Sequence, residues 1–213
     1  MSGRTVWLRE ERPAQRLGGF IAPTQGHIEV EGCEVGWAGL RRGVAFQEYA
    51  LFPRRTARRN VEFGLKARRL SVAQRRNIAQ RALEQVGLTH FAEFYRHHLS
   101  GGTRQRVALA RALAFDPALM LTDEPFAALD EEMGEELQSL VIKLWHETQK
   151  IFVYVTHSVH EAAYLASRVI VLTRHPARIR GVITVDLPGP RDRLSDEFHA
   201  YVRALVRIIR QHN

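Results

Sequence analysis

In the second half of the chain, short and continuous apolar runs alternate with stretches of helical period. The runs at residues 118–121, 151–155 and 169–172 are typical of strands buried on both faces of a sheet. A helix is expected to begin at Asp130, and another around residues 160–166. The apolar positions of the first of these helices fall on one stripe: Met133, Leu137, Leu140, Val141 and Leu144. The order strand, helix, strand, helix, strand predicts an α/β fold with a parallel sheet.

The first half of the chain contains two shorter strand patterns and further helical segments. Residues 27–31 alternate in polarity and, like residues 43–47, predict a short strand. A helix is expected to begin after Ser71, whose hydroxyl suits an N-cap, and to stop at Gly87. One face of this helix is apolar: Ile78, Ala82, Leu83 and Val86. Another helix is expected to follow residues 99–102.

These patterns describe a single domain with three parts. Residues 1–60 and 116–180 are expected to form the α/β core, and about 61–115 an inserted helical subdomain. Residues 181–213 form a C-terminal extension. Its helical stripe is expected to pack on the core: Phe198, Val202, Leu205, Val206 and Ile209.

The composition is that of a globular protein from a reducing compartment. Of the 213 residues, 45% are hydrophobic and 25% are charged. No stretch approaches the ~18 apolar residues of a membrane span, and residues 1–16 lack the apolar block of a signal peptide. Cys33 is the only cysteine, so an intrachain disulfide is excluded. We therefore expect a cytoplasmic protein.

The net charge of +8 comes mainly from arginine, because Lys66, Lys143 and Lys150 are the only lysines. A basic chain suits nucleic acid or an anionic membrane face. An arginine-rich genome that decorates exposed surfaces explains the same charge equally well. Net charge therefore does not choose between these classes.

An acidic pair, Asp123 and Glu124, follows the predicted strand at residues 118–121. The carboxyl end of a buried parallel strand is where open α/β sheets bind ligands. Asp123 suits Mg²⁺, usually held through water, because this ion prefers hard oxygen ligands. Glu124 suits the orientation or deprotonation of a water that attacks a phosphate. For the pair alone, an acidic cap on the next turn is the simpler alternative.

The sequence Ser100-Gly101-Gly102 lies just before a predicted helix. Free backbone N–H groups at a helix N-terminus attract anions, and glycines leave room for a phosphate to approach. Thr103-Arg104-Gln105-Arg106 continues this segment. A Ser-Gly-Gly sequence alone is more often a plain turn.

Three further polar residues complete a series along the chain: Gln47, Asp130 and His157. Gln47 and His157 each end a predicted strand, and a lone residue of this kind is more often a satisfied polar group than a catalyst. Asp130 closes the sequence Ala-Leu-Asp after the acidic pair. In this order, together with the acidic pair and the Ser-Gly-Gly turn, the series is hard to explain as coincidence.

At this point the chain resembles the nucleotide-binding subunit of ABC transporters, over about residues 17–172. The matched motifs are the Q-loop (Gln47), the signature motif (residues 99–102), the Walker B strand (119–123), the catalytic glutamate (Glu124), the D-loop (128–130) and the switch histidine (His157). Within the family, residues 46–49, 51–53, 123–126 and 143–145 look like the importers of nitrate, sulfonate, taurine or similar small anions.

The resemblance implies a P-loop-type ABC ATPase that binds two ATP between two head-to-tail subunits and hydrolyses them to drive import. Gln47 would sense the γ-phosphate and Mg²⁺, and Asp123 would hold the same Mg²⁺. Glu124 and His157 would act on the attacking water and the γ-phosphate. The residues implied in nucleotide binding are Ser100, Gly101, Gly102, Gln105 and Asp130.

The resemblance also implies the partners and the location. Transmembrane permease subunits would contact residues 49–53, a second ATPase subunit would complete a homo- or heterodimer, and a solute-binding protein would take part indirectly. The protein would sit peripherally on the inner face of the cell membrane. DNA-associated ABC ATPases are the rival class, but they carry long coiled coils, and the chain has no sustained heptad run, so nucleic acid is not expected.

The chain departs from the family at the phosphate-binding loop. A Walker A motif, Gly-x-x-x-x-Gly-Lys-Ser/Thr, cradles the β- and γ-phosphates, and the sequence contains none. Counting back from Gly18 and Gly19 puts the lysine position at Glu10, where Glu10 and Glu11 would repel a triphosphate, and Pro13 disfavours the helix that should follow. The strands that precede this loop are also expected to be missing. We therefore expect a sheet without one central strand, low stability and defective ATP binding.

Two explanations compete for this departure. In the first, residues 1–16 are a frameshifted or wrongly started remnant: if Arg9 to Arg12 were encoded CGG-GAA-GAG-CGC, reading one nucleotide later gives Gly-Lys-Ser. In the second, the chain is a degenerate partner that supplies only its signature motif in trans. A non-catalytic remnant is the remaining alternative to an active enzyme.

Overall fold

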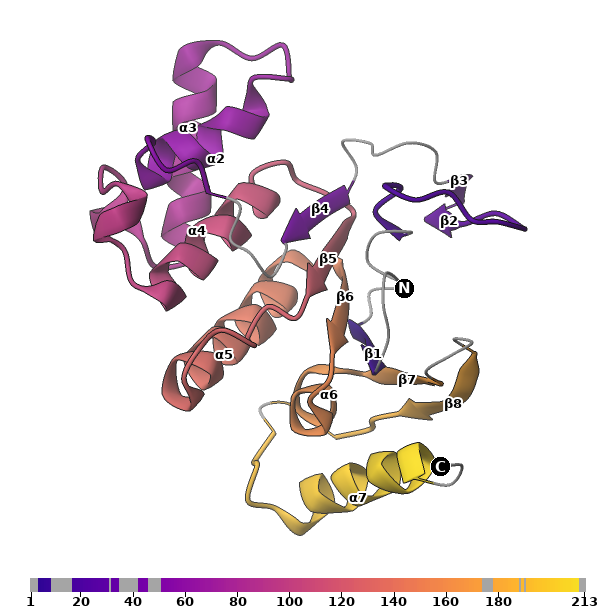
Figure 1. Cartoon of the computed structure of the whole chain (residues 1–213). Coiled ribbons are helices and arrows are strands. Elements are labelled where there is room, and N and C mark those ends of the chain that lie inside the picture. The colour runs from indigo at the N-terminus through magenta and orange to yellow at the C-terminus, as the bar shows by residue number, and fades with distance from the viewer. Residues whose placement is uncertain are drawn as a thin grey trace.

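The computed structural model describes residues 4–8, 17–30, 32–34, 42–45, 51–173, 178–187, 189 and 191–210. Its centre is a six-stranded sheet of order β4-β5-β6-β1-β7-β8 (Figure 1). The strands are β1 (Arg4–Leu8), β4 (Arg42–Ala45), β5 (Leu119–Asp123), β6 (Ile151–Thr156), β7 (Arg168–Leu172) and β8 (Ile179–Thr184). Neighbouring strands pair in parallel except β8, which runs antiparallel to β7. This confirms the predicted α/β fold with a parallel sheet.

The expected loss of a central strand is wrong, because β1 fills that place. It pairs in parallel with β6 on one side and with β7 on the other, so that Val6 stands opposite Tyr154 and Val169. The expectation of low stability therefore loses its basis. The segment 9–16, with Glu10, Glu11 and Pro13, lies outside the described residues.

The two faces of the sheet are covered differently. Met120, Phe152 and Tyr154 belong to the main apolar core with the helices α5 (Glu131–Thr148), α6 (Val159–Leu165) and α7 (Asp196–Arg210). Figure 1 shows these helices on one side of the sheet. Leu119, Leu121 and Val153 point to the other side, where Leu17 and Val30 cover them. Val30 belongs to a hairpin of β2 (Glu29–Val30) and β3 (Cys33–Glu34).

Three helices form a separate group, which we call the helical lobe: α2 (Ala57–Leu65), α3 (Val72–Gln85) and α4 (Gly101–Leu113). Two short 3₁₀ turns, Thr89–Phe91 and Arg96–His98, connect α3 to α4. Ser71 caps α3 as predicted and forms a reciprocal capping box with Gln74. The buried apolar side chains of the lobe, which include Val61, Leu83 and Val107, belong to the same core cluster as Met120 and Phe152 of the sheet.

The C-terminal helix α7 packs on α6, β7 and β8. Phe198, Val202, Leu205 and Ile209 of the predicted stripe are buried. The segment that leads to α7 is held by Arg191, which is 7% exposed and donates from Nη1 to the carbonyls of Ala163 (2.7 Å) and Tyr164 (2.9 Å) at the end of α6. In the described parts of the chain, no helix has the length and apolarity that a bilayer span requires.

Candidate functional site

The acidic pair lies where β5 ends. Residues 119–122 are buried, and Asp123 is the last residue of the strand. Glu124 adopts a left-handed backbone conformation, with φ 44°, and its N–H donates to the carbonyl of Val155 at 2.9 Å. A left-handed conformation costs a non-glycine residue roughly 1–2 kcal/mol, so the neighbouring strand must hold this turn. The turn fixes the direction of the Glu124 carboxylate.

His157 follows β6, the strand next to β5, and the structure brings it to the acidic pair. His157 Nε2 lies 2.5 Å from Glu124 Oε1. The histidine side chain is 67% exposed and the glutamate 21%. The pair therefore stands at the edge of the sheet, open to solvent on the histidine side, where a ligand and a water can reach it.

Burial, with a smaller contribution from the Glu124 charge, raises the pKa of Asp123 above its ordinary value, while His157 acts in the opposite direction. A half-buried carboxylate next to a second one is a hard oxygen donor, and a bound cation would stabilise its charged form. Within the described residues, no cluster of three or more His, Cys, Asp or Glu side chains forms a metal site. The chemistry of a single carboxylate such as Asp123 is compatible with Mg²⁺, which commonly takes one protein carboxylate and completes its shell with phosphate and water.

The Ser-Gly-Gly turn opens α4 as expected. Ser100 is the N-cap: its Oγ accepts a hydrogen bond from Thr103 N–H at 3.2 Å and lies 2.9 Å from Thr103 Oγ1. Ser100 is exposed, whereas Gly102 is buried against α5. A Cβ added to Gly102 would lie 1.9 Å from Met133 Cε. The outer end of the turn is thus accessible, and its inner glycine serves packing.

The remaining predicted site residues have different surroundings. Gln105 is 3% exposed, and its Oε1 has no hydrogen-bond partner, so the structure does not bring it to the surface with Ser100. Asp130 is exposed and caps α5, where its Oδ1 accepts from Met133 N–H at 2.9 Å. Gln47 lies outside the described residues.

Two polar residues near His157 were missed by sequence reasoning. Thr156 precedes the histidine and donates from Oγ1 to Glu161 Oε2 at 2.5 Å. Ser158 caps α6, with its Oγ accepting from Glu161 N–H at 3.2 Å. The signal was present in the sequence, because a serine followed three residues later by a glutamate is a helix-start pattern.

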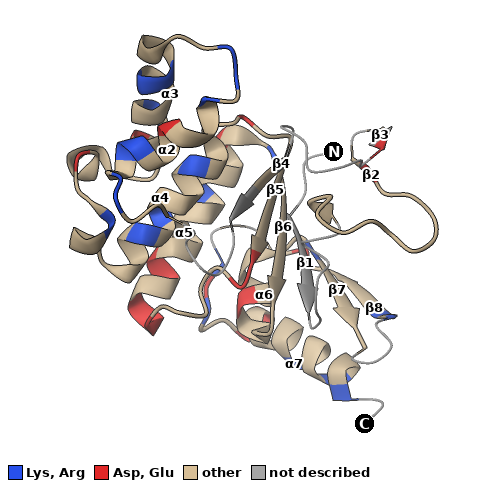
Figure 2. Ribbon diagram, turned by 45° about the horizontal axis from the view of Figure 1, so that its top comes forward, with Lys and Arg blue, Asp and Glu red and all other residues tan. Residues whose placement is uncertain are grey.

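A hollow lies beside α2 of the helical lobe, away from the acidic pair in sequence. It has a volume of about 460 Å³ and is lined by Phe52, Pro53, Arg54, Arg55 and Arg59. The Arg55 guanidinium lies 4.6 Å from the ring centre of Phe63 and 5.3 Å from that of Phe52. Figure 2 shows Lys and Arg positions (blue) along the ribbon of α2, α3 and α4, and acidic positions (red) at the start of α5. This surface combines cationic and aromatic groups.

Comparison with known proteins gives a consistent result. A family model described as ABC transporter matches residues 14–127. An uncharacterized ABC transporter ATP-binding protein of Methanocaldococcus jannaschii is 45% identical over 208 residues, which are 98% of this chain and 76% of that protein. The nitrate import ATP-binding protein NrtD of Synechocystis is 43% identical over 90% of this chain and 70% of its own.

The taurine import ATP-binding protein TauB of Pseudomonas putida is 44% identical over 76% of this chain and 62% of its own. Among solved structures, a dimeric ATP-binding cassette in a post-hydrolysis state, bound to ADP and phosphate, superposes with a TM-score of 0.73. It is 28% identical and covers 88% of this chain and 87% of its own.

Proposed function

The chain belongs to the ABC transporter family of transport ATPases, and from this premise we propose that it is the ATP-binding subunit of an importer for a small anion such as nitrate, a sulfonate or taurine. The relatives named for nitrate and taurine import support this choice of solute. The observation that carries the ATPase assignment is the 2.5 Å contact between His157 Nε2 and Glu124 Oε1 at the ends of two adjacent strands.

In the proposed reaction, Glu124 orients a water and accepts its proton, while His157 donates a hydrogen bond to the γ-phosphate. The contact between the two side chains keeps the imidazole of His157 next to the Glu124 carboxylate. Asp123 would hold Mg²⁺ together with Gln47, and the bound ion would neutralise charge on the phosphates. The backbone turn at Glu124 supplies the orientation that this role requires.

The signature segment is proposed to act on a nucleotide held mainly by a second subunit. Ser100 and Gly101 stand at the accessible start of α4, where N–H groups and the helix dipole favour a phosphate. None of the three lysines follows a glycine, so the chain has no Walker A lysine. We therefore propose weak ATP binding by the chain alone, and one composite site when it pairs with a subunit that carries the complete loop.

The hollow beside α2 is proposed to receive the permease. Phe52 and the three arginines that line it offer an aromatic wall and positive charge to a segment of the membrane subunit. This arrangement would place the protein at the inner face of the cell membrane. In terms of the proposed parts, residues 1–60 would supply the permease contact and, with residues 116–180, the nucleotide chemistry, and residues 61–115 would supply the signature segment.

The trans role can be tested with a heterodimer. Purified chain is mixed with a complete homologous ATPase subunit whose own signature serine is replaced by arginine, and ATP hydrolysis is measured. We expect Ser100→Arg in this chain to lower the remaining rate at least tenfold, because the bulky cation blocks the phosphate-facing turn. Ser139→Arg, at an exposed position on α5, is the matched control and should leave the rate unchanged.

An unchanged rate with Ser100→Arg would eliminate the trans role. An equilibrium measurement of ATP binding, made on the chain with and without that partner, then separates a subunit of an enzyme from a non-catalytic remnant. Binding that appears only with the partner supports the composite site.

A further inference from the structure

The imidazole of His157 is two-thirds exposed, so packing alone does not define its position. Its backbone, however, lies between two residues that are both hydrogen-bonded to Glu161, Thr156 to its carboxylate and Ser158 to its backbone N–H. We propose that Glu161 is a positioning residue for His157, acting through the hydroxyl of Thr156 and the backbone of Ser158. The inference rests on the proposed function only for its biological purpose, since the contacts exist in the chain alone.

The hydrogen bonds form a closed set around the histidine. Thr156 Oγ1 donates to Glu161 Oε2 at 2.5 Å and accepts from Ser158 N–H at 3.0 Å. The backbone N–H of Glu161 donates to Ser158 Oγ at 3.2 Å. Glu161 therefore binds the residue before His157 through its side chain and the residue after it through its backbone.

This arrangement differs from an ordinary helix cap. In a capping box, the glutamate accepts from the backbone N–H of the capping serine itself. Here that N–H of Ser158 is bonded to Thr156, and the Glu161 carboxylate accepts from the Thr156 hydroxyl instead. This hydroxyl belongs to Thr156, the residue directly before His157 in the chain. Thr156 is 4% exposed, so water competes little for these bonds.

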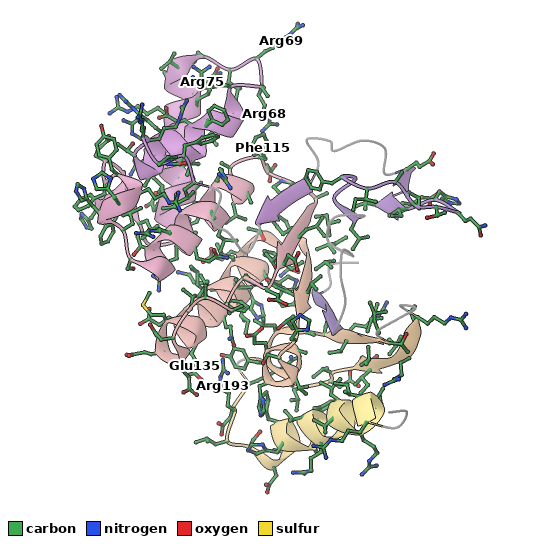
Figure 3. The ribbon with its side chains drawn as sticks, viewed as in Figure 1. Arg68, Arg69, Arg75, Phe115, Glu135 and Arg193 are labelled. Atoms are coloured by element: carbon green, nitrogen blue, oxygen red, sulfur yellow. The ribbon has the colours of Figure 1, made fainter. Side chains whose placement is uncertain are left out.

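The carboxylate of Glu161 is in turn influenced by the segment before α7. Arg193 acts on Glu161 as a favourable positive charge, and Glu124 as an unfavourable negative one. The Arg193 guanidinium lies 3.8 Å from the ring centre of Tyr164, donates to Gln138 Oε1 at 2.6 Å and lies 3.4 Å from Glu135 Oε1. Figure 3 shows Glu135 and Arg193 next to each other. Side chains of α5 and α6 thus meet around Arg193 of the C-terminal segment.

The test is an NMR measurement of the His157 imidazole in the full chain without nucleotide. A long-range ¹H–¹⁵N spectrum resolves the ring nitrogens of the ten histidines, and His157→Gln identifies the signal of interest. Glu124→Ala defines the chemical shift of an imidazole that has lost its carboxylate partner. We expect Glu161→Ala and Thr156→Val each to move the His157 signal more than half of the way to that position.

The conservative variants Glu161→Gln and Thr156→Ser keep the acceptor and the hydroxyl, and should restore the wild-type signal. Thr148→Val is the matched control, because the hydroxyl it removes donates to Leu144 O at 2.7 Å within α5. An unmoved His157 signal in Glu161→Ala or Thr156→Val, with the backbone amide spectrum still that of a folded chain, overturns the proposal. So does an equal movement in Thr148→Val.

If Glu161→Ala does not fold, Thr156→Val and Thr156→Ser test the proposal instead. It stands if the valine variant moves the His157 signal and the serine variant does not, and it fails otherwise. No step of this test requires ATP, so a failed ATPase assay with a complete partner would count against the proposed function and leave the positioning role standing.

Discussion

Three carboxylates, Asp123, Glu124 and Glu161, lie near the ends of β5 and β6. Asp123 and Glu161 both have a raised pKa, in each case mainly because burial disfavours the charged form, and the Glu124 charge adds to the effect. His157 acts on both in the opposite direction, and Arg193 also does so for Glu161. Such an accumulation of negative charge opposes folding, which is typical of a site built to bind a cation or a proton donor.

The variant Glu161→Gln tests, through the pH dependence of stability, whether the raised pKa of Glu161 destabilises the folded chain. In the unfolded chain Glu161 titrates at an ordinary glutamate value, and in the folded chain at a higher one. Between the two values, the folded state holds a proton that the unfolded state has lost, so the free energy of unfolding falls as the pH rises. The amide does not titrate, and this decline should be absent from the variant.

We therefore expect the Glu161→Gln chain to melt at a higher temperature than the wild type at pH 8. The difference should shrink toward pH 4. Thermal melts at several pH values measure it, with the exposed Glu84→Gln as control. A wild type that gains stability between pH 5 and pH 8 relative to the variant would contradict the raised pKa.

Among the elements, the contact between α4 and α5 depends on a glycine. Gly102→Ala would press its methyl group onto the terminal methyl of Met133, and because this flexible side chain can shift, we expect a loss of about 1 kcal/mol, at the low end for overpacking. Denaturant unfolding should show this loss, and adding Met133→Ala should recover most of it.

Gly134→Ala is the matched control: Gly134 is buried within α5, but a Cβ there meets nothing within 4 Å. It should stabilise the chain by about 0.4–1 kcal/mol, and equal losses at both glycines would contradict this account.

The elements with a strong apolar period were predictable from the sequence, and those defined by tertiary pairing were not. The helix after Ser71, the helix after Asp130 and the strand at residues 151–155 were predicted because each buries a regular pattern. The strand β8 was missed because Ile179 and Val182 are exposed, which leaves little alternation to detect.

At the candidate site, the sequence placed Glu124 and His157 at the ends of neighbouring strands, and the structure joins them. It did not indicate that Gln105 is buried, because a residue one turn into a helix can face either way. It also gave no sign of the contact of Arg193 with Gln138 and Tyr164. That contact joins residues far apart in the chain, and no local pattern encodes it.

For the whole molecule, the N-terminal strand determines whether the sheet is continuous. Deletion of residues 2–8 removes β1 from between β6 and β7, so two halves of the sheet lose their common neighbour. We expect this deletion to abolish the cooperative thermal transition, as followed by circular dichroism. Deletion of residues 211–213, which lie beyond the end of α7, is the control. A cooperative melt that survives the first deletion would show that β1 is dispensable.

The helical lobe also bears on the order in which the chain folds. It is inserted between β4 and β5, two strands that pair directly, with Arg42 opposite Leu119. Gly43 packs closely against Met120 and Pro117, and Arg68 donates to the carbonyl of Phe115 at 3.3 Å (Figure 3). Pairing β4 with β5 closes a long loop, and the entropic cost of this closure is high unless the segment between the two strands has already folded. The contacts among α2, α3 and α4 are local, so we expect these helices to assemble early. Their assembly would bring the two ends of the inserted segment together. In this order β4 joins the sheet late, and the folded lobe aligns it with β5.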